Sequence, residues 1–286
     1  MPLLYHWQSE NYYRDARFGF GYHLNQGNPL MQTLQTGDSL WAFTRNRSKQ
    51  YVFAAELIVR ACTKNAPNYR YGGYRVWADI ERSRYFDVDN SPNAAPLIRS
   101  LSVQASADVL GRSFQGHAAV RQLTELDHQV LARFTDGLPI LDAVSFYSED
   151  EIEAKLIHGD FEELDSLIRT DDPSREAIRR KYLYESWNKT RSQRLAHEVR
   201  DIYEGKCQVC GFDPLDEYGF HLCHAHHIIW LSRGGEDDIS NLCLLCPNHH
   251  QAVHAGDAIF DFESLLFTYN NGYSESLRID EHLAAS

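Results

Sequence analysis

The stretch that decides the fold of the C-terminal part of this chain spans residues 207–254 and reads CQVCGFDPLDEYGFHLCHAHHIIWLSRGGEDDISNLCLLCPNHHQAVH. It opens on the pair Cys207-x-x-Cys210 and holds most of the six cysteines of the chain, interleaved with histidines. Thiolate and imidazole at this density are typical metal ligands, and the clustering favours a metal site over a disulfide framework. The sequence therefore predicts a small domain organised by cations.

A structural metal is the first prediction. The tight turn around Gly211 makes the first pair a zinc knuckle, and soft thiolates with imidazole suit tetrahedral Zn²⁺. Spacing alone leaves two choices for the second pair of ligands, which are Cys243-x-x-Cys246 and Cys246-x-x-His249.

A second cation is predicted from the histidines. One strand should end at His226 and His227, residues 240–245 should form the next, and residues 247–255 should form a helix with proline in its first turn. His250 and His254 are four apart and share one helix face, so with His226 they could hold a divalent cation. Neighbouring strand residues point oppositely, which leaves His227 free to act as a base near neutral pH. For His221 and His224, a structural role is the favoured interpretation.

These residues resemble the HNH (ββα-metal) nuclease family. The shared pattern is a zinc knuckle, a metal ligand followed by a histidine base, Gly234-Gly235, Asn241-Leu242 and a final Leu-Cys-x-x-His-His. The resemblance implies catalytic roles for His227, Asn241 and His250. It also implies that the zinc ligands are Cys207, Cys210, Cys246 and His249. Two positions depart from the commoner pattern, because His249 replaces a cysteine and His226 replaces an aspartate.

The resemblance implies metal-assisted phosphodiester hydrolysis. His227 would take a proton from water, and Mg²⁺, Mn²⁺ or another divalent cation would neutralise charge on the phosphate and the leaving oxygen. Asn241 would brace the loop that carries His227. Arg233 is either a phosphate contact or a solvated loop charge.

Residues 1–135 read as a β-rich domain. Residues 39–44 and 51–59 predict a hairpin, residues 74–80 a strand, residues 90–96 a loop and residues 118–134 a helix. The helix would present one apolar face made of Val120, Leu123, Leu126, Val130 and Leu131.

The Gly37-Asp38-Ser39-Leu40-Trp41 turn into this hairpin resembles PUA-superfamily domains of the EVE type. That resemblance implies a small β-barrel that reads a modified base. The predicted pocket residues are Tyr22, His23, Trp41, Trp77 and Phe114, with Asn25 and Asp79 reading the base edge. Each of four arginines is predicted to be either a phosphate contact beside the pocket or a solvated surface charge: Arg70, Arg75, Arg82 and Arg84. For each aromatic side chain, core packing is the favoured alternative.

The predicted architecture is α+β, with a PUA-like barrel in residues 1–135, a helical linker in 136–200 and a ββα-metal HNH domain in 201–286. The net charge of −12 is uneven, because residues 1–100 carry +4 while residues 136–173 and 207–286 carry −10 each. Basic segments can contact phosphates whatever the total charge. A long helix beginning near the cap Ser174 should end at Gly205.

Together these features predict a cytoplasmic, modification-dependent DNA endonuclease of the restriction type, acting in phage defence. Its substrate would be double-stranded DNA with 5-methyl or 5-hydroxymethyl cytosine. No membrane segment is predicted, and a homodimer stays open. Two alternatives remain: an HNH nuclease gated by a protein or small signal, and a non-catalytic zinc module that binds nucleic acid.

Overall fold

The computed structural model describes residues 1–16, 23–67, 69, 72–141, 189–230 and 238–283. The chain divides into two compact units, one formed by residues 1–62 and 70–144 and the other by residues 63–69 and 145–286. The predicted linker, residues 136–200, lies largely outside the described residues. No described helix is both long enough and apolar enough to cross a membrane.

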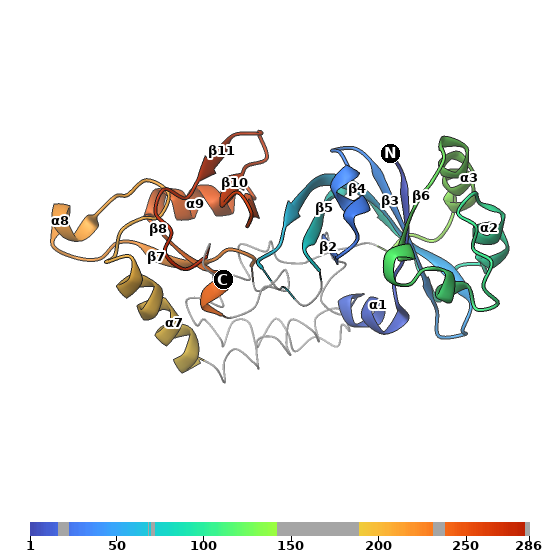
Figure 1. Cartoon of the computed structure of the whole chain (residues 1–286), viewed down its shortest axis with the longest axis horizontal. Helices are drawn as coiled ribbons and strands as arrows, with labels where there is room; N and C mark the ends of the chain where they lie inside the picture. The colour runs from blue at the N-terminus through green and yellow to red at the C-terminus, as the bar shows by residue number, and fades with distance from the viewer. Residues whose placement is uncertain (17–22, 68, 70–71, 142–188, 231–237, 284–286) are drawn as a thin grey trace. The chain divides into compact units, whose positions relative to one another are not determined.

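The first unit is built on a curled half-barrel sheet of six strands (Figure 1). The strand order is β2-β5-β4-β3-β1-β6, so β2 and β6 lie at the edges. The strands are β1 (Leu3–His6), β2 (His23–Gln26), β3 (Ser39–Arg45), β4 (Tyr51–Lys64), β5 (Tyr74–Tyr85) and β6 (Val120–Gln122). The predicted hairpin is confirmed, since β3 and β4 pair antiparallel. The predicted third strand is also confirmed and continues as far as Tyr85.

Both faces of this sheet are buried. The helical segments that cover it are α1 (Ser9–Ala16), η1 (Pro29–Thr33), α2 (Ala95–Ser100), η2 (Leu110–Ser113), η3 (Gly116–Ala118) and α3 (Glu125–Thr135). On one face Leu40 packs with Tyr12 of α1. On the other, Trp41 packs with Ile98 of α2 and Leu131 of α3. Burial of an aliphatic side chain such as Leu40, Ile98 or Leu131 contributes about 1.5–3 kcal/mol to the stability of the sheet.

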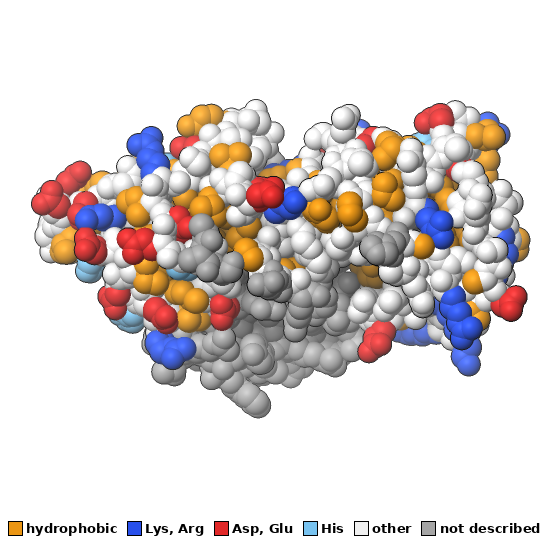
Figure 2. Space-filling model, in the orientation of Figure 1, with side chains coloured by type: hydrophobic (Ala, Val, Ile, Leu, Met, Phe, Trp, Pro, Cys, Tyr) orange, Lys and Arg blue, Asp and Glu red, His pale blue; other side chains and the backbone are white. Residues whose placement is uncertain are grey.

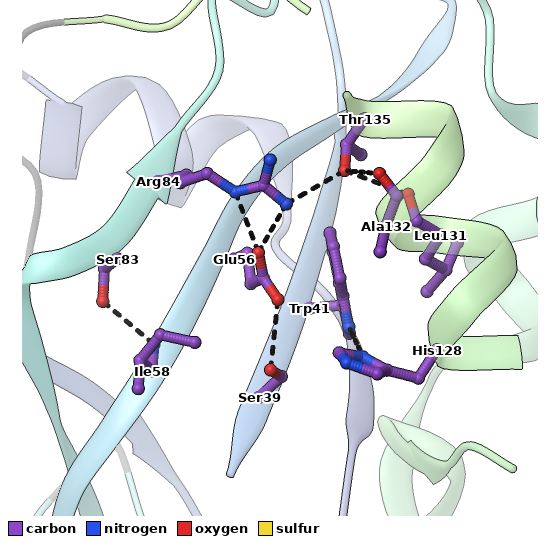
Figure 3. A network of polar contacts seen from close by, with 10 residues as sticks. All are labelled: Ser39, Trp41, Glu56, Ile58, Ser83, Arg84, His128, Leu131, Ala132 and Thr135. Carbon is purple, nitrogen blue, oxygen red and sulfur yellow. Dashed lines mark hydrogen bonds and ion pairs between the residues drawn. The ribbon is translucent and has the colours of Figure 1, made fainter. Parts of the chain in front are cut away.

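A polar network lies between the sheet and α3 (Figure 3). Arg84 donates to Glu56 Oε2 from Nε at 2.9 Å and from Nη2 at 2.6 Å, and Ser39 Oγ donates to Glu56 Oε1 at 3.1 Å. Trp41 Nε1 donates to Nδ1 of His128 at 3.0 Å. Buried polar groups cost free energy unless they are paired. These five side chains find their partners within the first unit.

The prediction of one helix over residues 118–134 is wrong in its first part. Val120 to Gln122 form strand β6 against β1, and α3 begins only at Glu125. The cause is a capping box, in which Thr124 Oγ1 accepts from Asp127 N at 3.1 Å and Asp127 Oδ2 accepts from Thr124 N at 2.9 Å. The predicted apolar face is therefore also wrong in part, because Leu126 is 69% exposed.

The second unit is made of short elements. They are α7 (Lys189–Ile202), α8 (Pro214–Tyr218), β7 (His224–His227), η5 (Ile239–Asn241), β8 (Leu242–Leu245), α9 (Pro247–Ala255), β9 (Ile259–Asp261), β10 (Leu266–Thr268) and β11 (Ser274–Ser276). β7 and β8 pair antiparallel, and β9, β10 and β11 form a separate antiparallel sheet. The described part of the predicted long helix is α7, which ends before Gly205 as expected.

Acidic side chains mark the surface of this unit. On the face in Figure 2 they gather over α8, whose first turn contains Asp216 and Glu217. This agrees with the net charge of −10 over residues 207–286. The surface would repel phosphate unless cations are bound.

Candidate metal centres and active site

The first arm of the cysteine cluster is a tight turn. Gly211 N donates to the carbonyl of Cys207 at 2.8 Å, and Cys207 N donates to the carbonyl of Phe212 at 3.0 Å. Gly211 has φ of +74°, a left-handed conformation that glycine adopts without steric cost. The turn brings Cys210 beside Cys207, as the sequence spacing predicts.

The second arm is the start of α9. Cys246 is the residue that precedes the helix, Pro247 occupies its first turn, and His249 follows half a turn later. His249 Nδ1 lies 3.1 Å from Cys246 Sγ and 3.6 Å from Cys207 Sγ. Of the two pairings that spacing left open, the structure brings Cys246 and His249 to the knuckle.

The donor set fits zinc. Ligand atoms of Cys207, Cys210, Cys246 and His249 all lie within 4.8 Å of one another. A tetrahedral zinc with ordinary bond lengths holds sulfur and nitrogen about 3.5 Å apart. Burial raises the pKa of Cys207 to about 12, so a thiolate there needs a compensating cation. The cluster is therefore a candidate structural zinc site.

Gln208, inside the knuckle, was missed by sequence reasoning. Its side chain is fully buried, with Oε1 accepting from Leu244 N at 2.7 Å and Nε2 donating to the carbonyl of Ile279 at 3.2 Å. It thereby ties the knuckle to β8 and to the chain beyond β11. A glutamine between two cysteines gives no sequence signal of that role.

The second cluster is made only of imidazoles. His226 comes from β7, while His250 and His254 come from α9 one helical turn apart. The ring of His226 lies 5.2 Å from that of His250 and 4.8 Å from that of His254, between centroids. Ligand nitrogens of all three lie within 4.8 Å of one another. The predicted histidine trio is thus brought together.

His226 is the buried member of this trio. It is fully buried, and neither ring nitrogen has a hydrogen-bond partner among the described residues. Desolvation, together with the neighbouring histidines, lowers the pKa of His226 well below its ordinary value. A neutral imidazole with unmatched nitrogens is the form that binds a metal cation. The site therefore fits a divalent cation.

His227 stands outside both clusters. It follows His226 on β7, is buried to 7% exposure, and pairs in register with Leu242. Asn241 fixes the chain just beyond it, because its Oδ1 accepts from Ile229 N at 2.8 Å and its Nδ2 donates to the carbonyl of Ile229 at 2.8 Å. Through these bonds the end of η5, which leads into β8, holds the backbone that follows His227. Arg233 lies outside the described residues.

His221 is exposed and its ring lies beside Gly205. A Cβ on Gly205 would come within 2.5 Å of His221 Nδ1, and Gly205 has φ of +80°. His224 is exposed, with its ring 5.5 Å from that of His250. Neither residue belongs to a metal-ligand group among the described residues.

Of the five predicted base-pocket residues, the three whose side chains are described are buried. Trp41 and Phe114 pack inside the core that faces α2 and α3, and Trp77 is buried to 3% exposure. Tyr22 lies outside the described residues, and only the backbone of His23, in β2, is described. The base-pocket role of these five residues stays a prediction.

Most of the arginines predicted as phosphate contacts in the first unit lie beside other side chains of that unit. Arg75 is 1% exposed and lies 5.3 Å from the ring of Trp77, while Arg84 is paired with Glu56. Arg82 is exposed and lies 4.0 Å from Asp79, the predicted edge reader. The side chain of Arg70 is not described, and Asn25 lies in β2.

Two strands, a helix and converging cation ligands define the class of ββα-metal domains. The family described as "HNH endonuclease" matches this chain over residues 207–256. Residues 207–256 are thus an HNH endonuclease domain, and this family consists of metal-dependent phosphodiester hydrolases.

Two known proteins are similar to parts of the chain. "Anaredoxin" from Nostoc sp. strain PCC 7120 is 33% identical over 64 residues, which cover 22% of this chain and 76% of that protein. A solved structure, "Structure of the Type IV phosphorothioation-dependent restriction endonuclease ScoMcrA", is 15% identical with a TM-score of 0.20. That match covers 82% of this chain and 45% of the ScoMcrA chain, and so loose a superposition defines no shared fold.

Proposed function

We propose that this chain is a DNA endonuclease in which His227 is the general base. The observation that carries the proposal is the division of labour on β7. His226 converges with two other imidazoles, while its neighbour His227 stays outside that group. His227 is thus next to the proposed cation site without being one of its ligands.

Each residue has a defined task in this reaction. His227 takes the proton of the attacking water, and the backbone that positions it is braced by Asn241 through Ile229. His226, His250 and His254 hold the divalent cation, which when bound neutralises charge on the scissile phosphate and the departing oxygen. Imidazole ligands suit Zn²⁺ and Ni²⁺ better than Mg²⁺, which prefers oxygen ligands.

Charge supports a contribution of the first unit to DNA binding. Arg45 at the end of β3 is exposed, as are Arg47 and Lys49 in the turn before β4, although Arg47 also lies 3.6 Å from Asp89. The acidic HNH domain offers no comparable group, since residues 207–286 contain two Lys/Arg. Basic side chains of the first unit would therefore supply the sequence-independent part of the affinity.

The finer part of the proposal is that the first unit reads a modified cytosine and thereby restricts modified double-stranded DNA. It is supported by the resemblance of the Gly37-Asp38 hairpin to EVE-type domains. A signal-gated nuclease is the second candidate, and the burial of Trp41, Trp77 and Phe114 favours it. Equal cleavage of unmodified, 5-methylated and 5-hydroxymethylated DNA would select the second candidate.

The test of the nuclease is cleavage of double-stranded DNA by the full chain with Mn²⁺, Ni²⁺, Zn²⁺ or Mg²⁺. His227→Ala should lower the rate about 10²–10⁴-fold, the usual contribution of a general base. Its zinc content should not change, because His227 lies outside the cysteine cluster. His197→Ala, on the exposed side of α7, is the matched control. Undiminished cleavage by His227→Ala would contradict the proposed role.

A further inference from the structure

The sheet β9–β11 follows the segment matched by the HNH family, and it carries an acidic residue to the zinc cluster. Glu275 lies in the middle of β11, in register with the buried Phe267 of β10. Its carboxylate Oε1 lies 3.5 Å from Nε2 of His249. The two side chains are only 21% and 19% exposed.

The two nitrogens of the His249 ring therefore face different partners. Nδ1 faces Cys246 Sγ and Cys207 Sγ, at 3.1 and 3.6 Å. Nε2 faces Glu275 on the opposite side. When Nδ1 binds a metal, Nε2 carries the remaining proton, on the side of the ring where the carboxylate of Glu275 lies 3.5 Å away.

The carboxylate is itself held in place by two tyrosines. Tyr269 Oη donates to Glu275 Oε2 at 2.8 Å, and Tyr273 Oη donates to Glu275 Oε1 at 3.3 Å. The two tyrosine rings are stacked, 5.9 Å apart. A Cβ on Gly256, at the end of α9, would come 2.6 Å from Tyr269 Cδ1, so a glycine there lets Tyr269 approach the helix.

We propose that Glu275 is a positioning residue of the cysteine-rich metal site, acting through His249, and that β9–β11 is thus part of that site. A carboxylate that accepts from the distal N–H of a metal-bound imidazole fixes its tautomer and ring orientation and strengthens it as a ligand. The proposal rests on zinc in the cysteine cluster and not on nuclease activity. If Glu275 made only a surface ion pair, its loss would leave zinc binding unchanged.

The experiment measures zinc affinity of the full chain by competition with a chromophoric chelator, in the absence of DNA. Loss of such a partner typically weakens metal binding about 10–100-fold, and Glu275→Ala should fall in that range. Glu275→Gln keeps an acceptor oxygen without the charge, so it should retain part of the affinity. Tyr269→Phe, which only loosens the carboxylate, should have the smallest effect.

Co²⁺ substitution adds a readout that a merely structural role would not change. The visible absorption of Co²⁺ in the cluster should shift in Glu275→Ala and return towards the wild-type spectrum in Glu275→Gln. Glu198→Gln, which removes one exposed carboxylate from α7, is the charge control and should match wild type.

Wild-type zinc affinity and an unshifted Co²⁺ spectrum in Glu275→Ala would overturn the proposal, even if the variant melts at a lower temperature. If Glu275→Ala does not fold, Glu275→Gln decides, because it fills the same volume. Wild-type affinity in that variant would then overturn the proposal, and weakened affinity would support it. Because no DNA is present, a failure of the nuclease proposal would not alter these results.

Discussion

His6 in the first unit and His226 in the second are both histidines with buried nitrogens that have no partner among the described residues. Desolvation lowers the pKa of both, that of His6 to about 4. Their surroundings differ. The ring of His6 stacks on Phe43 at 4.9 Å and lies 5.9 Å from Tyr51, whereas His226 faces two further imidazoles. An unmatched buried nitrogen therefore indicates a metal site only where other ligands converge on it.

The largest expected difference between the two histidines is in catalysis. His226→Leu should lower metal-dependent DNA cleavage on the order of 10³-fold or more, because the cation loses its buried ligand. His6→Phe should cleave at the wild-type rate, since no metal ligand lies beside it. Cleavage rates of both full-length variants at saturating Mn²⁺ test the contrast. Equal losses of cleavage rate in the two variants would contradict the proposed difference between His226 and His6.

The next contrast is in the pH dependence of stability. Above pH 6.5, His6 is neutral in the folded and unfolded states and contributes nothing. Between pH 6.5 and about 4, the unfolded state binds the proton first, so the first unit loses stability as pH falls. The loss reaches about 3 kcal/mol, since each pKa unit is worth about 1.4 kcal/mol.

His6→Phe should abolish that part of the acid sensitivity. The measurement is amide hydrogen exchange of peptides from β1 and β3 between pH 7 and pH 4, corrected for the intrinsic rate. Peptides of the first unit exclude the separate effect of acid on the zinc ligands. An unchanged pH profile in the variant would show that His6 is not the responsible group.

The smallest effect concerns stability without the catalytic cation. His226→Leu should stabilise the chain by about 1 kcal/mol when only the cysteine-cluster zinc is present, because it removes unmatched buried nitrogens. Adding Mn²⁺ at about 100 times its Kd should stabilise wild type by about 2.7 kcal/mol and leave the variant unchanged. Thermal unfolding with and without Mn²⁺ measures both. Mn²⁺ stabilisation of the variant would place the cation elsewhere.

The sequence predicted contacts best where the two partners are close in the chain. Cys207 and Cys210, or His250 and His254, are positioned by one turn of backbone, so spacing predicts their convergence. Glu275 meets His249 only after three further strands have folded, and nothing local announces the contact. The helix predicted over residues 118–134 failed because apolar spacing ignored the capping box at Thr124.

Burial is a second property that residue type does not predict. Trp41 is as suitable for a base pocket as for a core when only its type is known. Its burial depends on the packing of α2 and α3 against the sheet, and so on the whole topology. The same holds for Arg84, whose charge is matched by Glu56 on a neighbouring strand.

The adjacency of His249 and His250 has a mechanical consequence. His249 belongs to the cysteine cluster and His250 to the histidine trio, so a zinc ion bound by the cysteine cluster would fix the direction of the helix axis. His254 stands roughly 7.5 Å along that axis from His249, at about 1.5 Å of rise per residue. Metal–ligand distances tolerate errors of about 0.2 Å, which corresponds to a tilt of only about 1.5° at this distance. The cysteine cluster, which takes no part in the proposed reaction, would therefore have to hold the axis of α9 within this angle for His254 to remain a ligand of the catalytic cation.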